Sequence, residues 1–237
     1  MSEVLIEARG IHSFYGQSHI LHGIDFSIAK GEAVGLMGRN GMGKSTLVKS
    51  LVGVITPRRG ELFVRGVPAL GMETYRISRM GIAYVPEGRG IFPNLSVKEN
   101  LLLAARAGVD GCNDWTYERV LDSFPRLRER LGNGGAQLSG GEQQMLTIGR
   151  ALMTNPDLLI LDEATEGLSP LISKEIWRMI STIRESGMAT LLIDKNYEAI
   201  SDISTRNLIM VKGKIVFEGD STELRSDPAR LKEHLGV

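Results

Sequence analysis

The sequence is poor in cysteine, in net charge and in long apolar runs. Its single cysteine, Cys112, excludes an intrachain disulfide scaffold and fits a reducing compartment. The 28 Lys and Arg residues balance the 28 Asp and Glu residues, and zero net charge argues against a nucleic-acid-binding protein, which usually carries a basic excess. The longest apolar runs, such as Leu101–Ala105, are far shorter than the about 20 residues of a membrane helix, so we expect that the chain does not itself cross a bilayer.

Hydrophobic residues are nevertheless plentiful, at 42% of 237 positions, and with 24% charged residues they suit a globular protein with a sizeable core. The length fits one large domain or a domain with an insert. Continuous apolar runs at 158–161 and 189–193 are typical of parallel strands buried on both faces, and residues 169–185 between them have a helical pattern. Strands that alternate with helices predict an α/β fold.

The middle of the chain departs from this alternation. Residues 90–154 are mostly helical in pattern: Ser96 and Glu99 have the spacing of a capping box, and Pro125 should break or bend a helix over 116–130. Residues 3–30 instead have the pattern of short strands with turns. We therefore predict a helical insert in an α/β core that begins with β structure.

A glycine-rich loop follows the apolar run 32–37 and precedes a helical pattern at 45–54. It matches the phosphate-binding pattern G-x-x-x-x-G-K-[ST]. Glycines let backbone N–H groups surround a phosphate, the helix start adds positive potential, Lys44 would neutralise the β and γ oxygens, and the Ser45 hydroxyl would bind Mg²⁺. The loop predicts an ATP-type ligand with Mg²⁺, and its residues are Gly38, Arg39, Asn40, Gly41, Met42, Gly43, Lys44, Ser45 and Thr46.

Two carboxylates stand at the end of the buried strand predicted at 158–161. Ligands of open α/β sheets bind at this end of the strands. Asp162 is a candidate to hold Mg²⁺ through water, and Glu163 is a candidate to accept a proton from an attacking water molecule. Together with the glycine-rich loop, they predict a nucleoside triphosphatase.

A second candidate anion site precedes a helix predicted over 143–153. A small hydroxyl and two glycines expose N–H groups at a helix start, as phosphate sites do. One nucleotide cannot easily use both this site and the loop of the same chain, so we predict a head-to-tail dimer in which each nucleotide is held by two chains. The residues of this second site are Ser139, Gly140, Gly141, Glu142 and Gln143.

The segment Leu138–Gln143 resembles the LSGGQ signature of the ATP-binding cassette (ABC) ATPases, with Glu142 at the usual Gln position. The order of the three motifs also resembles that family, and the resemblance covers essentially the whole chain. It implies an α/β phosphate-loop NTPase core with a mostly parallel sheet, an N-terminal antiparallel β part and an inserted helical subdomain. We expect one ABC ATPase domain over 1–237, its core at about 1–89 and 155–237 and its helical insert at about 90–154.

The resemblance assigns three further residues. Tyr15 stands where the family has an aromatic residue that stacks on adenine. Glu87 takes the place of the Q-loop glutamine, where a carboxylate can still meet Mg²⁺. Lys195 takes the place of the switch histidine that contacts the γ-phosphate, and Ala164–Ser169 corresponds to the D-loop at the dimer seam but departs from its commonest form. The expected catalytic residues are thus Lys44, Glu87, Glu163 and Lys195.

Several segments, among them Tyr84–Arg89 and Ile91–Pro93, resemble the shorter ATP-binding subunit of bacterial branched-chain amino acid importers. That implies a second ATPase subunit in a heterodimer or a homodimer, two membrane permeases and, indirectly, a periplasmic solute-binding protein. It also implies a peripheral location on the cytoplasmic face of the inner membrane. The alternatives are a urea or amide importer, a soluble ABC ATPase without a transport role, another phosphate-loop enzyme such as a kinase, and a non-catalytic nucleotide-binding scaffold.

Overall fold

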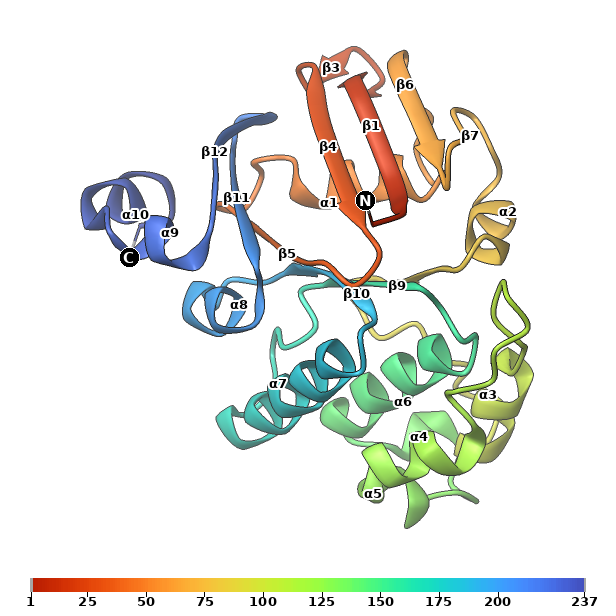
Figure 1. Cartoon of the computed structure of the whole chain (residues 1–237). Coiled ribbons are helices and arrows are strands. Elements are labelled where there is room, and N and C mark those ends of the chain that lie inside the picture. The colour runs from red at the N-terminus through yellow and green to blue at the C-terminus, as the bar shows by residue number, and fades with distance from the viewer. Residues whose placement is uncertain (1, 237) are drawn as a thin grey trace.

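The structure is a computed structural model that describes residues 2–236, so Met1 and Val237, the two ends of the predicted domain, lie outside the described residues. A central sheet separates two layers, an antiparallel β layer on one face and a group of helices on the other (Figure 1). The predicted α/β fold with a mostly parallel sheet is confirmed. Among the described residues, no helix combines the length and the apolar character needed to span a membrane.

The central sheet has six strands in the order β12-β11-β5-β10-β9-β8, and only the β11–β12 pair is antiparallel. Both predicted parallel strands are confirmed, and they are buried along their full lengths because layers cover both faces of the sheet. The strands are β5 (Ala33–Met37), β8 (Ile82–Val85), β9 (Leu158–Asp162), β10 (Ala189–Ile193), β11 (Arg206–Val211) and β12 (Lys214–Gly219).

The antiparallel layer is a four-stranded sheet in the order β4-β1-β6-β7, beside a two-stranded ribbon formed by β2 and β3. In β4 the buried residues Ile24, Phe26 and Ile28 alternate with exposed positions, the pattern of a strand with one face on a core. The expected antiparallel β part is thus present at the start of the chain. Its strands are β1 (Val4–His12), β2 (Phe14–Tyr15), β3 (Ser18–His19), β4 (Ile24–Ala29), β6 (Arg59–Val64) and β7 (Val67–Pro68).

The chain between β8 and β9 is helical, as predicted, and the boundaries at about 90 and 154 stay a prediction. Ser96 and Glu99 form the expected capping box, and Pro125 starts a new helix where a break was predicted. The helix predicted over 143–153 begins earlier, because the Ser139 side chain caps it. These elements are α3 (Val97–Ala104), α4 (Tyr117–Ser123), α5 (Pro125–Arg128), the 3₁₀ turn η1 (Gly135–Gln137) and α6 (Gly140–Leu152).

The other helices pack on the central sheet or close the fold. The helix predicted at 169–185 is confirmed as α7, with Pro170 in its first turn, where a missing N–H costs nothing. The helices outside the segment between β8 and β9 are α1 (Lys44–Leu51), α2 (Thr74–Arg79), α7 (Pro170–Glu185), α8 (Tyr197–Ile203), α9 (Ser221–Arg225) and α10 (Pro228–His234).

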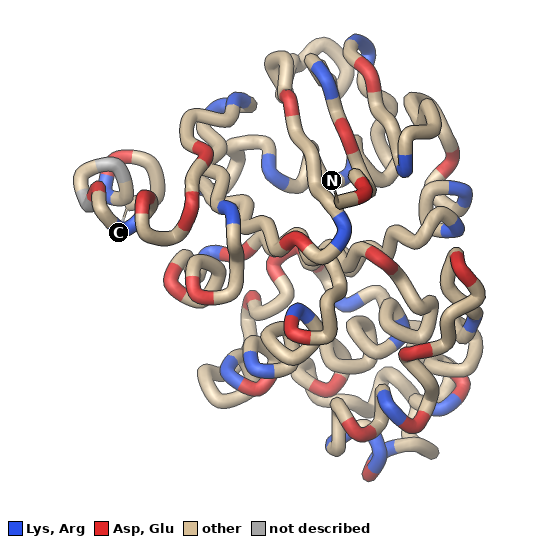
Figure 2. The backbone as a smooth tube through the Cα atoms, viewed as in Figure 1, with Lys and Arg blue, Asp and Glu red and all other residues tan. Residues whose placement is uncertain are grey.

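Two apolar cores lie on opposite faces of the central sheet. One joins the antiparallel layer and α1 to the sheet, and the other joins α3–α7 to it. Lys and Arg are interspersed with Asp and Glu along the described part of the backbone (Figure 2). The two cores hold the C-terminal ends of β5, β9 and β10 in a fixed relation, and the candidate site is built on those ends.

Candidate nucleotide site

The loop Gly38–Thr46 connects the C-terminal end of β5 to the first turn of α1. Gly38 and Gly43 have φ values of 145° and 105°, conformations that a residue with a side chain rarely adopts. The buried Lys44 curls back over the loop, and its Nζ donates hydrogen bonds to the carbonyl oxygens of Gly38 (2.8 Å) and Arg39 (3.2 Å). Burial lowers the pKa of Lys44, against the raising effect of nearby carboxylates. Loop and lysine thus form a preformed cradle.

A pocket of about 380 Å³ opens over this cradle. It brings together the glycine-rich loop and three residues that the resemblance or the strand pattern placed here: Tyr15, Glu87 and Glu163. The side chain of Tyr15 is half exposed in β2, so it is not a core aromatic. The pocket is lined by Tyr15, Ile20, Asn40, Gly41, Gly43, Lys44, Ser45, Thr46, Glu87, Glu163 and Glu166.

Two loop side chains point away from the pocket. The Arg39 guanidinium donates to the backbone carbonyls of Lys232 and Glu233 in α10, at 3.4 and 3.2 Å. The Met42 sulfur accepts the backbone N–H of Lys212 at 3.2 Å. Arg39 and Met42 can therefore serve a ligand only through their backbone, while their side chains fasten the loop to the C-terminal part of the chain.

Asp162 lies beneath the pocket at the end of β9 and is almost fully buried. It accepts hydrogen bonds from the Ser45 hydroxyl (3.3 Å) and from the Tyr84 hydroxyl (3.2 Å). Burial raises the pKa of Asp162, and the two hydrogen bonds oppose that shift. Ser45 and Asp162 were each expected to hold Mg²⁺, and the structure brings the two side chains together. Tyr84 was not assigned to the site, because only the sheet order places β8 beside β9.

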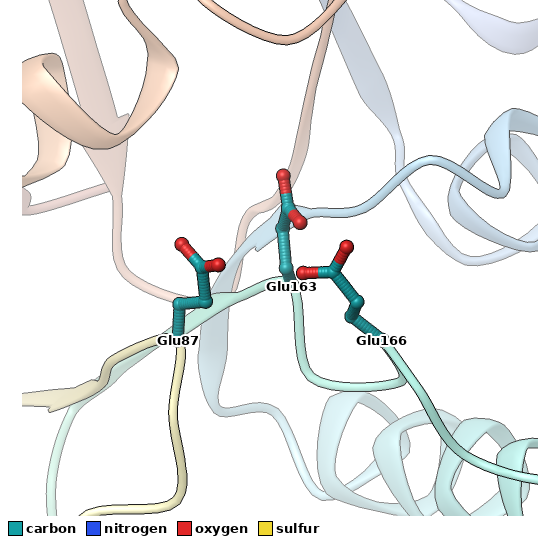
Figure 3. A group of neighbouring side chains, drawn as sticks. All are labelled: Glu87, Glu163 and Glu166. Carbon is teal, nitrogen blue, oxygen red and sulfur yellow. The ribbon is translucent and has the colours of Figure 1, made fainter.

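Glu163 extends from the end of β9 into the pocket. It is a non-glycine residue with a left-handed φ of 52°, and its N–H donates to the Ile193 carbonyl oxygen at 2.7 Å, which turns the side chain away from the sheet. Figure 3 shows Glu163 between Glu87 and Glu166, and one carboxylate oxygen from each lies within 4.8 Å of the others. Burial first, and then the neighbouring Glu166, raise the pKa of Glu163 to about 7.

Lys195 reaches this acidic group from the loop after β10. Its Nζ forms an ion pair with Glu166 and lies 3.8 Å from the Glu163 carboxylate, yet the side chain does not line the pocket. Asp194, which is buried, accepts the Thr165 hydroxyl at 2.7 Å and so ties the loops after β9 and β10 together. Glu166 lies in the D-loop stretch but had no role assigned from the sequence, since its charge partner lies on another loop.

The segment Ser139–Gln143 lies outside the pocket of its own chain. Ser139 and Glu142 form a capping box in which the Ser139 N–H donates to the Glu142 carboxylate at 2.7 Å and the Glu142 N–H donates to the serine hydroxyl at 3.4 Å. The Gln143 amide donates to the Gly135 carbonyl oxygen at 3.2 Å. Ser139 itself is exposed. The segment is therefore a helix start on the surface that another molecule can reach.

The family model of the ABC transporter matches residues 21–166 of this chain, which include the glycine-rich loop, the segment Ser139–Gln143 and both strand-end carboxylates. The high-affinity branched-chain amino acid transport ATP-binding protein BraG of Pseudomonas aeruginosa is 37% identical over 95% of this chain and 97% of its own length. The probable branched-chain amino acid transport ATP-binding protein LivF of Archaeoglobus fulgidus is 36% identical, over 96% of this chain and 97% of that protein.

Similarity extends to proteins named for other cargoes and to solved structures. An autoinducer 2 import ATP-binding protein of Enterobacter sp. is 36% identical over 93% of this chain and 44% of that protein. A solved structure described as the ATP-binding subunit of an ABC transporter superposes with a TM-score of 0.80 and 31% identity, over 95% of this chain and 93% of the other.

Proposed function

The chain belongs to the ABC transporter ATP-binding family and is an ATPase, and from that premise we propose that it is the motor subunit of a bacterial importer of branched-chain or other hydrophobic amino acids. The observation that carries the proposal is the similarity, over nearly the full lengths of both proteins, to BraG and LivF. The alternatives are the motor of a urea or amide importer and a soluble ABC ATPase without a transport role.

ATP would occupy the pocket of about 380 Å³. The half-exposed ring of Tyr15 is free to stack on the adenine, and the N–H groups of the loop Gly38–Thr46 would surround the β- and γ-phosphates. Lys44 would exchange its two hydrogen bonds to loop carbonyls for stronger ones to phosphate oxygens. The loop geometry thus supplies binding without a large rearrangement.

The side-chain oxygen atoms around Asp162 are suitable ligands for Mg²⁺, which prefers oxygen ligands and keeps several bound water molecules. The Ser45 hydroxyl already lies 3.3 Å from the buried Asp162 carboxylate, and Glu87 lines the same pocket. We infer that Ser45 holds the ion directly, Asp162 holds it through water, and Glu87 meets it from the loop after β8. When bound, Mg²⁺ would neutralise charge on the β- and γ-oxygens.

Glu163 is the proposed general base. It lies in the pocket with a pKa of about 7, which suits a group that accepts a proton from water near neutral pH. The water proton would pass to a Glu163 carboxylate oxygen as the water oxygen bonds to the γ-phosphorus and the bond to the β–γ bridging oxygen breaks. Lys195, the residue at the switch position, lies beside this base.

A second ATPase subunit, in a heterodimer or a homodimer, would complete the site. Ser139–Gln143 is an exposed helix start that does not reach the pocket of its own chain, so we propose that it caps the nucleotide held by the partner's loop. Bound ATP then holds the two subunits together. Its hydrolysis breaks the link between the β- and γ-phosphates and leaves two anions, ADP and phosphate, that repel each other. This is how the chain would convert chemistry into movement.

The movement would reach two membrane permeases through the loop 88–95. Phe92 in this loop is 43% exposed, and Asn100 fixes the loop by bonding both the N–H (2.9 Å) and the carbonyl oxygen (3.0 Å) of Phe92. A rigid loop with an apolar side chain suits a docking contact. The chain would then sit at the cytoplasmic face of the inner membrane, and a periplasmic solute-binding protein would deliver the cargo on the far side.

The test is reconstitution of the chain with two permeases and a second ATPase subunit of the branched-chain amino acid type, in proteoliposomes that contain the corresponding binding protein. We expect Mg·ATP to drive uptake of labelled leucine and not of labelled urea. Uptake of urea without uptake of leucine would instead support the alternative, the motor of a urea or amide importer. ATP hydrolysis that does not change when permeases are added would contradict a transport role.

A further inference from the structure

The wall of the pocket that faces the phosphates carries an excess of negative charge. Glu87, from the loop after β8, converges there with Glu163 and Glu166, which both lie between β9 and α7 (Figure 3), and oxygens of the three lie within 4.8 Å of one another. A nucleoside triphosphate is itself a polyanion, so three ionised carboxylates in this wall would repel it. The positive charge of Lys44 opposes part of this negative charge, while its Nζ donates hydrogen bonds to the carbonyl oxygens of Gly38 and Arg39.

Lys195 lies beside these acids, where its positive charge can balance their negative charge. Its ammonium group contacts Glu166 and lies 3.8 Å from Glu163, whereas Lys195 is absent from the residues that line the pocket. The lysine therefore faces the acids and not the space that the nucleotide fills.

Hydrogen bonds made by the residue before Lys195 hold the backbone of the loop after β10 in place. Asp194, the residue before it, is buried and accepts the Thr165 hydroxyl at 2.7 Å, and it also accepts the Asn196 N–H at 3.0 Å. These bonds hold the loop after β10 against the D-loop, which carries Glu166. The acid and the lysine are thus presented to each other by two loops that are fastened together.

We propose that Glu166 and Lys195 form a neutral pair that sets the charge of the wall facing the γ-phosphate. In this pair Lys195 is the counter-ion of Glu163 and Glu166, not a phosphate ligand, and Glu166 is a positioning residue that keeps the ammonium beside the base. The proposal rests on the proposed function, because it assumes that ATP occupies this pocket. It explains how a lysine can stand at the switch position without the imidazole that the family uses.

If Glu166 and Lys195 form this neutral pair, removal of the lysine alone should weaken the binding of a nucleotide that carries a γ-phosphate. Lys195→Met removes the counter-ion of Glu163 and Glu166 beside the γ-phosphate, so a non-hydrolysable ATP analogue should bind about fivefold more weakly. ADP, which lacks the γ-phosphate, should change less than twofold. The double variant Glu166→Gln with Lys195→Met removes both charges of the pair, and the affinity for the analogue should return to within about twofold of the unmodified chain.

Isothermal titration calorimetry of the full-length chain and its variants measures the affinities for the ATP analogue and for ADP in the presence of Mg²⁺. Lys174→Met, a change of an exposed lysine on α7, and Glu129→Gln, a change at the end of α5, are the matched controls and should bind like the unmodified chain. Thermal unfolding checks that each variant folds, and Lys195→Gln serves as a second neutral variant.

If the double variant binds as weakly as Lys195→Met, Lys195 contacts the phosphate directly and the neutral pair is refuted. An equal loss for ADP and the ATP analogue would also refute it, because the effect would not depend on the γ-phosphate. Failure of the proposed function has a different signature: the unmodified chain itself would show no binding of either nucleotide.

Discussion

Gly38 offers the sharpest test of how the fold positions the phosphate loop. It has a φ of 145°, and a Cβ added there would lie 2.4 Å from the carbonyl oxygen of Met210 in β11. The Met210 oxygen is a backbone atom of β11, and a Cβ is bonded directly to the backbone, so no side-chain rotation can relieve the contact. Ordinary contact needs about 3.4 Å, so Gly38→Ala must push the loop about 1 Å away from β11.

The displacement has a calculable effect on nucleotide binding. Phosphate oxygens accept charge-assisted hydrogen bonds from the loop N–H groups, and the loss of two such bonds at about 1.4 kcal/mol each corresponds to about 100-fold weaker binding. The unfavourable φ should also lower the free energy of unfolding by about 1–3 kcal/mol. Calorimetric titration with an ATP analogue measures the first effect, and urea unfolding measures the second.

Gly66→Ala is the matched control. Gly66 also has a positive φ, of 74°, but a Cβ there meets nothing within 4 Å, and the residue lies in the turn between β6 and β7. It should lose stability by about 1–2 kcal/mol and bind the nucleotide normally. If Gly38→Ala also binds the nucleotide normally, the close approach of Gly38 to β11 does not set the position of the loop.

Three further predictions concern the proposed roles. Glu163→Gln should leave ATP affinity within a few-fold and lower the rate of phosphate release by about 100-fold or more, and a rate within threefold of normal would exclude Glu163 as the base. Tyr15→Ala should weaken ATP binding about tenfold while Tyr15→Phe preserves it, because stacking needs only the ring; equal losses in the two variants, measured by calorimetry, would point to the hydroxyl instead. Ser139→Ala should lower stability by about 1 kcal/mol, leave ATP binding by the isolated chain unchanged, and weaken ATP-dependent dimer formation in analytical ultracentrifugation; weaker binding by the isolated chain would place Ser139 in its own pocket.

Local signals were sufficient for much of the fold and for part of the site. The glycine-rich loop, the capping box of Ser96 with Glu99 and the helix break at Pro125 depend on neighbours within a few residues, so their sequence patterns predict them directly. The apolar runs that form β9 and β10 could also be predicted without knowledge of the neighbouring strands. A strand buried on both faces is apolar at successive positions and does not alternate between apolar and polar residues. The motifs also indicated Ser45 and Asp162 as candidates to hold the same Mg²⁺ ion, whereas the direct contact between these two residues depends on the fold.

Long-range packing decided the rest. Tyr84 meets Asp162 only because β8 lies beside β9, and Glu166 meets Lys195 only because two loops from different strands are held together by Asp194 and Thr165. Pattern in the chain cannot reveal such contacts, since the partners are far apart in sequence and each is an ordinary polar residue at a loop. The sequence thus determined which chemical groups are present at the strand ends, and the strand order of the central sheet determined which of them face one another.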